Sequence, residues 1–234
     1  MTLLHTEKLT KIFGGLTAVN DVNFEVAKGE VHALIGPNGA GKSTFVGLVS
    51  GRIPATDGAV WFEGENVSKL PAHARIKLGM AYTFQITAIY AKLSLYDNVA
   101  LALGQWDRDA AADALDKVGL RDRIDQIAGD LAYGHQRLLE IAMGVAQSPR
   151  LLILDEPTQG LAESEIADFN NLINGLRATT TILLIEHNMD VVMGLADRIT
   201  VLDMGMILAT GTPDEIRANQ RVQDAYLGTS HAET

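Results

Sequence analysis

A nine-residue segment, Gly36-Pro-Asn-Gly-Ala-Gly-Lys-Ser-Thr44, constrains the fold of this 234-residue chain more than any other feature. It matches the pattern G-x-x-x-x-G-K-[ST], in which a glycine-rich loop joins a strand to a helix and surrounds phosphate groups. Its flanks agree with that geometry, because residues 31–35 are a short run dense in apolar residues and residues 43–50 have helical spacing. The segment therefore predicts a strand, a phosphate-binding loop and a helix, in that order.

Each part of this loop has a chemical task. Gly39 and Gly41 lack a Cβ atom, so backbone N–H groups can approach phosphate oxygens closely, and the following helix adds the positive end of its dipole. Lys42 would place an ammonium between β- and γ-phosphate oxygens, while Ser43 would ligate Mg²⁺ and Thr44 would reach the α-phosphate. The expected ligand is a nucleoside triphosphate. The structural alternative is a strand-to-helix turn with an incidental lysine.

A second motif supplies acids at the end of a buried strand. Residues 151–154 are four consecutive apolar residues, and Asp155 and Glu156 follow them directly. Parallel strands are buried on both faces and deliver ligands at their carboxyl edge. Asp155 is expected to hold magnesium through water, and Glu156 to polarise an attacking water as a general base. An apolar strand followed by two acids also arises by chance, so this assignment depends on the phosphate loop; together the two motifs predict hydrolysis.

Apolar periodicity organises the rest of the chain. Residues 1–65 alternate short apolar runs with turn signals and predict a strand-rich beginning. Residues 86–148 change to helical spacing and predict a mostly helical insert, after which short strands and helices alternate as in a largely parallel sheet. One last helix is expected over about 213–228, because Thr212-Pro-Asp-Glu215 combines an N-cap, a proline at the first helical position and a capping-box glutamate. The expected helices before it cover 43–50, 93–103, 110–118, 136–147, 163–177 and 189–196.

Composition limits the function. Nineteen basic residues against 29 acidic ones give a net charge of −10, which disfavours a protein that coats nucleic acid. The chain is 47% apolar and has no cysteine, so it has an ordinary globular composition without disulfides, thiolate metal sites or a cysteine nucleophile. Neither a secretory signal nor an apolar run of membrane-spanning length is evident, so we expect a soluble intracellular chain.

Five features occur together in this chain: the phosphate loop, Gln85, residues 131–140, the strand ending in Asp155 and Glu156, and His187. In combination they resemble the nucleotide-binding subunit of an ATP-binding cassette transporter. The resemblance covers nearly the whole chain. It implies an α/β fold: a P-loop NTPase (RecA-like) core with a mostly parallel sheet, an N-terminal antiparallel β subdomain and a helical subdomain insert. On this basis we expect one domain, with its core at about 1–85 and 149–212 and its helical subdomain at about 86–148.

The resemblance also assigns roles to single residues. Gln85 would be a magnesium and water ligand, although a lone glutamine is otherwise an ordinary surface amide. His187 follows a predicted strand at the ligand edge and would donate to the γ-phosphate, helping Glu156 to position water; its alternative is a polar loop residue. Phe13 would stack on adenine unless it belongs to the core of the first strands. The resulting nucleotide-binding set is Phe13, Gly36, Asn38, Gly39, Ala40, Gly41, Lys42, Ser43, Thr44 and Gly134; the catalytic set is Glu156, His187, Lys42 and Gln85; the metal ligands are Ser43, Gln85 and Asp155.

Residues 131–135, Leu-Ala-Tyr-Gly-His, occupy the place of the family signature LSGGQ and share only Leu131 and Gly134 with it. Gly134 would let a backbone N–H approach the γ-phosphate of ATP bound to a second subunit, beside a helix N-terminus. Ala132 lacks the usual serine hydroxyl, which removes one hydrogen bond worth about 1.5–3 kcal/mol. Ala162 stands where an aspartate normally contacts the other subunit. Ala132 implies slower or weaker dimer closure, and Ala162 implies asymmetry or weak communication between the subunits. Inactivation is not expected, because Glu156 and His187 are both present. An ordinary amphipathic helix with an N-terminal glycine is the structural alternative.

Three details resemble the subgroup that imports branched-chain amino acids, urea or short amides: residues 13–20, residues 185–190, and the ending from Gly211 to Gly228. The resemblance implies ATP and Mg²⁺ as cofactors. It also implies a second ATPase subunit and two permease subunits as partners, with an extracytoplasmic solute-binding protein acting indirectly. The chain would then lie peripherally on the inner face of the cell membrane. Apolar residues between 85 and 103 would receive a permease helix or fill the insert's own core. They are Ile86, Ile89, Tyr90, Leu93, Leu95 and Tyr96.

Two other classes remain open from the residues. A small-molecule kinase shares the phosphate loop but needs an acceptor site and a lid, and it would not release phosphate without an acceptor. A cassette that acts on DNA or RNA usually carries a long insertion or a second cassette, for which 234 residues leave no room. Salt-sensitive nucleic-acid binding would support that class.

Overall fold

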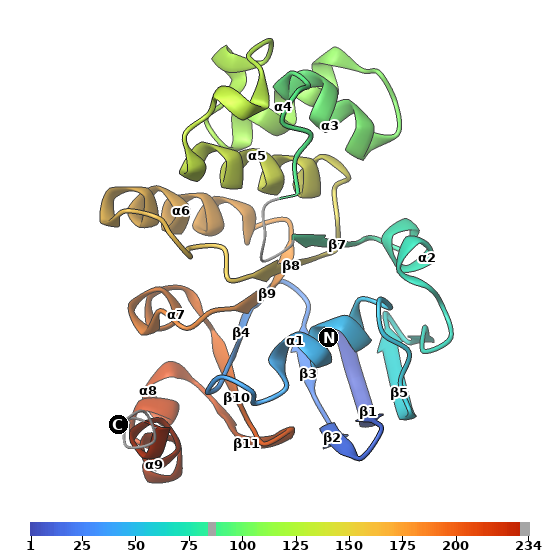
Figure 1. Ribbon diagram of the computed structural model, residues 1–234, viewed down its shortest axis with the longest axis vertical. Coiled ribbons are helices and arrows are strands. Elements are labelled where there is room, and N and C mark those ends of the chain that lie inside the picture. Colours follow the sequence, from blue (N-terminus) through green and yellow to red (C-terminus); the bar gives the residue numbers. More distant parts are fainter. Residues whose placement is uncertain (84–87, 230–234) are drawn as a thin grey trace. The chain divides into compact units, whose positions relative to one another are not determined.

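The computed structural model describes residues 1–83 and 88–229 of the chain (Figure 1). The chain divides into two compact units: unit 1 contains Met1–Leu78 and the chain from Thr181 onward, and unit 2 contains Gly79–Thr180. Unit 2 is larger than the expected insert of residues 86–148, because it also includes a strand on each side of the insert and the helix after the second strand. Over the described ranges, no helix combines the length and apolarity needed to cross a bilayer.

The expected strand-rich beginning forms a five-stranded antiparallel sheet in unit 1. Its order is β2-β1-β5-β6, and β3 pairs with β1. Leu3, Leu4 and Leu9 of the first strand are buried, whereas its last residues, Ile12 and Phe13, are exposed. The strands are β1 (Thr2–Phe13), β2 (Leu16–Val22), β3 (Glu25–Ala27), β5 (Asp57–Phe62) and β6 (Glu65–Asn66).

The second sheet of unit 1 carries the phosphate loop. Its strands follow the order β11-β10-β4-β9, in which β10, β4 and β9 are parallel and β11 is antiparallel. Every residue of β4 and β9 is buried, as expected of parallel strands covered on both faces. The strands are β4 (Val31–Ile35), β9 (Thr181–Ile185), β10 (Arg198–Asp203) and β11 (Met206–Gly211), and the helices that accompany them are α1 (Lys42–Val49), α2 (Ala72–Lys77) and α7 (Met189–Leu195).

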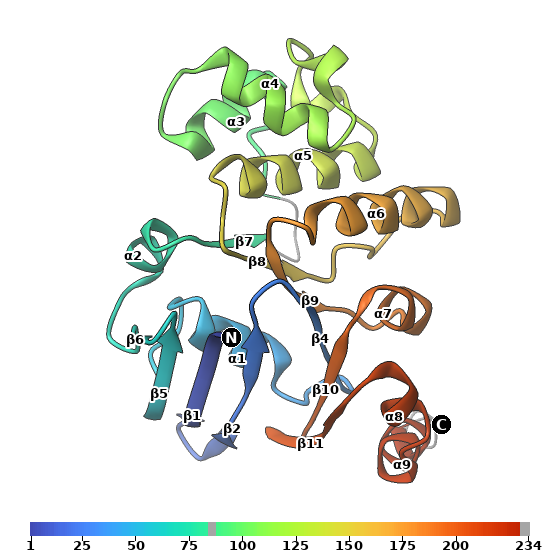
Figure 2. The same cartoon turned by 180° about the vertical axis from the view of Figure 1, so that it is seen from behind.

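The prediction of a single C-terminal helix is wrong, because the chain forms two helices there, α8 (Pro213–Arg217) and α9 (Gln220–Thr229). The start of α8 agrees with the sequence: Thr212 Oγ1 accepts from the Glu215 N–H, and Glu215 Oε2 accepts from the Thr212 N–H. Asn219 then interrupts the helix, because its side-chain oxygen accepts from the N–H groups of Arg221 and Val222 and so begins α9. Figures 1 and 2 show α7, α8 and α9 beside β10 and β11, where Ile216 and Val222 join the core.

Unit 2 combines two parallel strands with a layered group of helices. β7 (Met80–Thr83) pairs with β8 (Leu151–Asp155), and α5 (Tyr133–Ala146) packs on β7 and contacts α3 (Leu95–Leu103) and α4 (Arg108–Lys117), as both ribbon views show. α6 (Glu163–Leu176) follows β8. The helical interpretation of the insert is confirmed, although α5 begins three residues before the expected 136. Two 3₁₀ turns, Arg121–Arg123 and Ala128–Asp130, connect α4 to α5.

Candidate nucleotide-binding site

The phosphate loop lies between β4 and α1, as the motif predicts. Lys42 Nζ donates to the carbonyl oxygens of Gly36, at 2.7 Å, and Pro37, at 3.1 Å. The ammonium is therefore held inside the loop. In the first turn of α1, Ser43 is exposed and Thr44 is half-buried. This arrangement suits the binding of a polyphosphate.

Two glycines of the loop are required by close backbone neighbours. Gly36 has φ +153°, and a Cβ atom there would lie 2.1 Å from the carbonyl oxygen of Leu202. Gly41 has φ +100°, and its Cβ atom would lie 2.3 Å from the carbonyl oxygen of Ala18. The turn after β10 also supports the loop, since the Gly205 N–H donates to the Ala40 carbonyl at 2.9 Å. Of the remaining predicted loop residues, Asn38 and Gly39 are exposed and Ala40 is buried.

His187 leaves the same sheet edge as the phosphate loop. β9 lies beside β4 in parallel register, with Ile185 opposite Leu34, so both strands end together. Glu186 is buried, and its Oε2 accepts from the N–H groups of His187 and Asn188 at 2.7 and 2.9 Å. The His187 side chain is 60% exposed. Unit 1 therefore presents the loop lysine and this imidazole from adjacent strands.

Unit 2 supplies the two acids at the end of β8. Asp155 is 4% exposed, and the Tyr82 hydroxyl of β7 donates to its Oδ2 at 2.7 Å. Glu156 is half-buried and has φ +48°, in the left-handed region. Gln85 lies outside the described residues. The Ser43 hydroxyl of unit 1 and the Asp155 carboxylate of unit 2 are each oxygen groups of the kind that Mg²⁺ prefers, so each is chemically suited to its predicted role.

The signature stretch begins α5 with Ala132 exposed at the N-cap, where its own side chain makes no capping hydrogen bond. Gly134 is buried, and a Cβ atom there would lie 2.2 Å from Oε1 of Glu165. Glu165 Oε2 also accepts from the Ala162 N–H at 2.8 Å. The sequence explained Gly134 by phosphate approach alone; within unit 2, a larger residue there would also have to displace the Glu165 carboxylate.

Sequence reasoning missed three side chains beside these motifs. Tyr82 donates to Asp155; Tyr133 lies against Gly160, whose Cβ atom would be 3.1 Å from the tyrosine ring; and Arg137 donates to the Glu156 carbonyl at 3.3 Å. The only available signal was that charged Arg137 lies among apolar residues of a predicted amphipathic helix. Such a residue is seldom buried without a partner.

The structure gives the exposure of Phe13 and of the apolar segment at the start of the insert. Phe13 ends β1 and is 46% exposed with Lys11 Nζ 4.9 Å from its ring centre, so it is not part of the buried core. In the insert, Leu95 is fully buried whereas Tyr90 is 58% exposed, so that segment both fills its own core and presents apolar surface. Ile86 lies outside the described residues.

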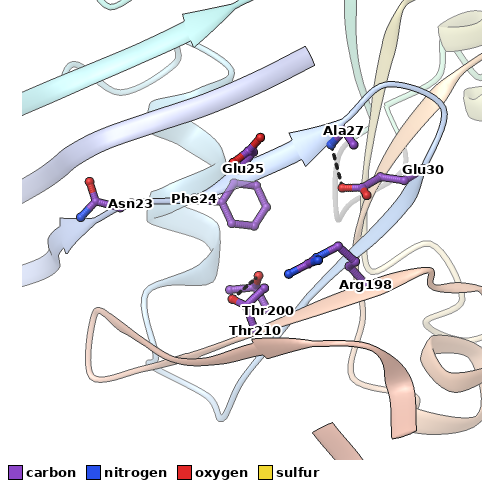
Figure 3. Close-up of a pocket in the computed structure, with 8 residues that line it drawn as sticks. All are labelled: Asn23, Phe24, Glu25, Ala27, Glu30, Arg198, Thr200 and Thr210. Atoms are coloured by element: carbon purple, nitrogen blue, oxygen red, sulfur yellow. Dashed lines mark hydrogen bonds between the residues drawn. The ribbon is translucent and has the colours of Figure 1, made fainter. Parts of the chain in front are cut away.

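Unit 1 also contains a cavity of about 400 Å³ with both polar and apolar lining residues, shown in Figure 3. Glu30 accepts from the Ala27 N–H at 2.8 Å, and the Thr200 and Thr210 hydroxyls are 2.9 Å apart. Buried His32 joins the two pairs, with Nδ1 2.9 Å from Glu30 and Nε2 2.8 Å from Thr200. None of the residues that line the cavity belongs to the phosphate loop. These hydrogen bonds join the strands around the cavity, and its lining contains none of the predicted nucleotide-binding residues.

Comparison with protein families agrees with this geometry. Residues 19–159 match the model described as "ABC transporter", and residues 206–232 match the model described as "Branched-chain amino acid ATP-binding cassette transporter". The first match covers more than half of the chain and includes the phosphate loop, the signature stretch and both acids.

Similar proteins and structures extend the match to almost the whole chain. The high-affinity branched-chain amino acid transport ATP-binding proteins LivG of Escherichia coli and BraF of Pseudomonas aeruginosa are each 39% identical, over 97% of this chain and 98% of theirs. The lipopolysaccharide export ATP-binding protein LptB of E. coli is 32% identical. A nucleotide-free ATP-binding cassette from an ABC transporter has a TM-score of 0.88 at 28% identity, covering 97% of this chain and 99% of that one.

Proposed function

Because the chain belongs to the ATP-binding cassette transporter family and is an ATPase of that family, we propose that it energises a binding-protein-dependent importer of branched-chain amino acids. The observation that carries the solute class is the 39% identity to LivG and BraF over nearly the full length of each protein. The C-terminal family match at 206–232 agrees with it. LptB, which is named for lipopolysaccharide export, is less similar at 32%.

Binding of ATP in this proposal depends on the phosphate loop. Lys42 moves its ammonium from the carbonyls of Gly36 and Pro37 to phosphate oxygens, and the N–H groups at the start of α1 donate to the same anion. Ser43, Asp155 and Gln85 would hold Mg²⁺, which neutralises charge on the phosphates when bound. Phe13, exposed at the end of β1, offers its ring face to the adenine.

Hydrolysis in this proposal depends on Glu156 and His187. Glu156 accepts a proton from the attacking water, and its half-buried carboxylate is directly after the strand that carries Asp155. His187 donates to the γ-phosphate, and buried Glu186 fixes the backbone from which the imidazole extends. Both residues act on an oxygen of the terminal phosphate or on the water beside it, so hydrolysis needs no separate acceptor.

The proposed assembly contains a second ATPase subunit and two permease subunits, with an extracytoplasmic solute-binding protein acting indirectly. Exposed apolar side chains on the insert, Tyr90, Leu101 and Trp106, support a protein contact there. Attachment to the permease places the chain on the inner face of the cell membrane. ATP-driven closure of two subunits would be transmitted through the insert to the permease.

Two substitutions test the catalytic assignment on the purified chain. Glu156→Gln keeps the shape of the side chain but removes the base, so we expect unchanged ATP affinity and a loss of turnover of at least about 100-fold. Lys42→Ala removes an ammonium from the phosphate site, so we expect weaker ATP binding. Nucleotide affinity is measured by equilibrium titration and turnover by phosphate release. Full turnover in Glu156→Gln would remove that residue from its role.

The solute class needs a separate experiment with the assembled transporter. Reconstituted into vesicles with its permease and binding protein, the complex is expected to hydrolyse ATP faster with leucine, isoleucine or valine than with urea or a short amide. Stimulation by urea or a short amide alone would favour the other importers of this subgroup. Binding of the chain to RNA or DNA that weakens as salt rises would instead favour a cassette acting on nucleic acid.

A further inference from the structure

Arg137 is a buried charge attached to the segment that carries Glu156. Its side chain is 3% exposed, and Nη1 donates to Oε2 of Glu140, itself 5% exposed, at 3.0 Å. Nη2 donates to the backbone carbonyl of Glu156 at 3.3 Å. Burying a guanidinium is costly unless its charge and its N–H groups have partners, and here one partner is the residue assigned to activate water.

The backbone of Glu156 explains why such a partner is needed. Its φ of +48° lies in the left-handed region, which non-glycine residues rarely adopt because Cβ approaches the carbonyl oxygen. Rotation toward an ordinary φ would turn the Cα–Cβ bond relative to β8 and redirect the carboxylate. A hydrogen bond from Arg137 to the carbonyl opposes that rotation.

Arg137 also links this segment to the signature stretch. It lies one turn after Tyr133 in α5, and its guanidinium carbon is 6.0 Å from the centre of the tyrosine ring. That ring lies against Gly160, four residues after Glu156. The first turns of α5 therefore contact residues 156–160 at both ends of the segment.

We propose that Arg137 is a positioning residue for Glu156: it holds the strained backbone of Glu156 and couples the start of α5 to the orientation of the carboxylate. The inference rests on the role given to Glu156 under the proposed function. Arg137 acts through the Glu156 backbone, so its loss reduces turnover without weakening nucleotide binding.

The main test variant removes both buried charges together. Arg137→Met combined with Glu140→Leu replaces an ion pair by apolar side chains of similar size, a change that buried pairs often tolerate. We expect unchanged ATP affinity and a fall in kcat of about 10- to 100-fold, the range for one charge-assisted hydrogen bond. The matched control, Glu140→Gln, leaves the bond to Glu156 in place and should keep kcat within about threefold. Unchanged kcat in the double variant would overturn the proposal.

A cycle with Glu156→Gln separates positioning from a general structural role. If Arg137 acts only through the Glu156 carboxylate, adding the double change to Glu156→Gln lowers the residual turnover no further. A further fall of the same size as in the wild-type background would contradict the proposal. If the double variant does not fold, the test uses Arg137→Lys, because one ammonium cannot reproduce the forked contact of the guanidinium with both partners. We expect the same fall in kcat in this variant. Full kcat would overturn the inference.

The same set of variants distinguishes failure of the Glu156 role from failure of the Arg137 role. Full turnover in Glu156→Gln would refute the proposed catalytic role and this inference together. Loss of turnover in Glu156→Gln, with full turnover in the folded Arg137 variants, would refute this inference alone.

Discussion

Gly36 and Gly41 differ from Gly39 in what surrounds them. All three have positive φ, but only the first two have a backbone oxygen close to where a Cβ atom would be: that of Leu202 at 2.1 Å and that of Ala18 at 2.3 Å. Nothing lies within 4 Å of the corresponding position at Gly39. Packing against a backbone oxygen therefore requires glycine at two positions of the loop, whereas at the third only the backbone conformation favours it.

This difference predicts unequal effects of alanine. Gly39→Ala should lower the free energy of unfolding by about 1–2 kcal/mol, the cost of a left-handed conformation with a Cβ atom. Gly41→Ala adds a clash with backbone and should cost about 2–5 kcal/mol. Urea unfolding of the two variants measures both values. Equal losses would mean that the Ala18 carbonyl moves away freely.

Helix α1 is held at its end by a side chain from α2. Arg75 is buried, and its Nη1 donates to the carbonyls of Leu48 and Val49 at 2.8 and 2.6 Å. Nε and Nη2 donate to the carbonyls of Leu70 and Ser68. Burial lowers the pKa of Arg75 to about 10, so the side chain is still charged at neutral pH. One guanidinium thus satisfies the last carbonyls of the helix that begins at the phosphate loop.

Removing this guanidinium should destabilise the protein. Arg75→Met leaves buried carbonyls without a donor, so we expect the free energy of unfolding to fall by about 2–5 kcal/mol. Lys77→Met changes an exposed cation on the same helix and is the matched control, with an expected change within about 0.5 kcal/mol. Chemical denaturation measures both. If the two variants unfold alike, the Arg75 contacts do not stabilise the end of α1.

The complete molecule is predicted to work in pairs. The family resemblance implies that the start of α5 reaches ATP bound by a second subunit, and in the proposed mechanism a single chain does not surround the γ-phosphate. Hydrolysis per chain should therefore fall as the protein is diluted below its dimerisation range. Glu156→Gln with Mg²⁺ and ATP should elute at twice the monomer mass, whereas Lys42→Ala should remain a monomer because it binds ATP poorly. A rate per chain that stays constant on dilution to monomers would contradict the paired mechanism.

Local patterns were sufficient for most elements and for the loop. The strand, glycines and lysine at 31–44 are adjacent in the chain, and the Thr212 capping box uses residues three apart, so each could be recognised without knowledge of packing. The C-terminal segment was predicted as one helix but forms two, because the Asn219 side chain accepts from the N–H groups of the following turn. That contact is also local, and asparagine at a helix start was the signal that could have revealed it.

Contacts between distant residues were decided by the tertiary structure. Arg137 donates to the carbonyl of a residue 19 positions later in the chain, and Tyr82 donates to a carboxylate 73 positions later. Gly36 packs against the carbonyl oxygen of Leu202. No periodicity encodes such pairs, because they depend on how strands and helices pack after they form. The amino-acid order was enough to identify the chemistry of the phosphate loop, since its groups are neighbours in the chain. Folding alone determined which side chains hold the acids in position, since those groups come together only when the core excludes water.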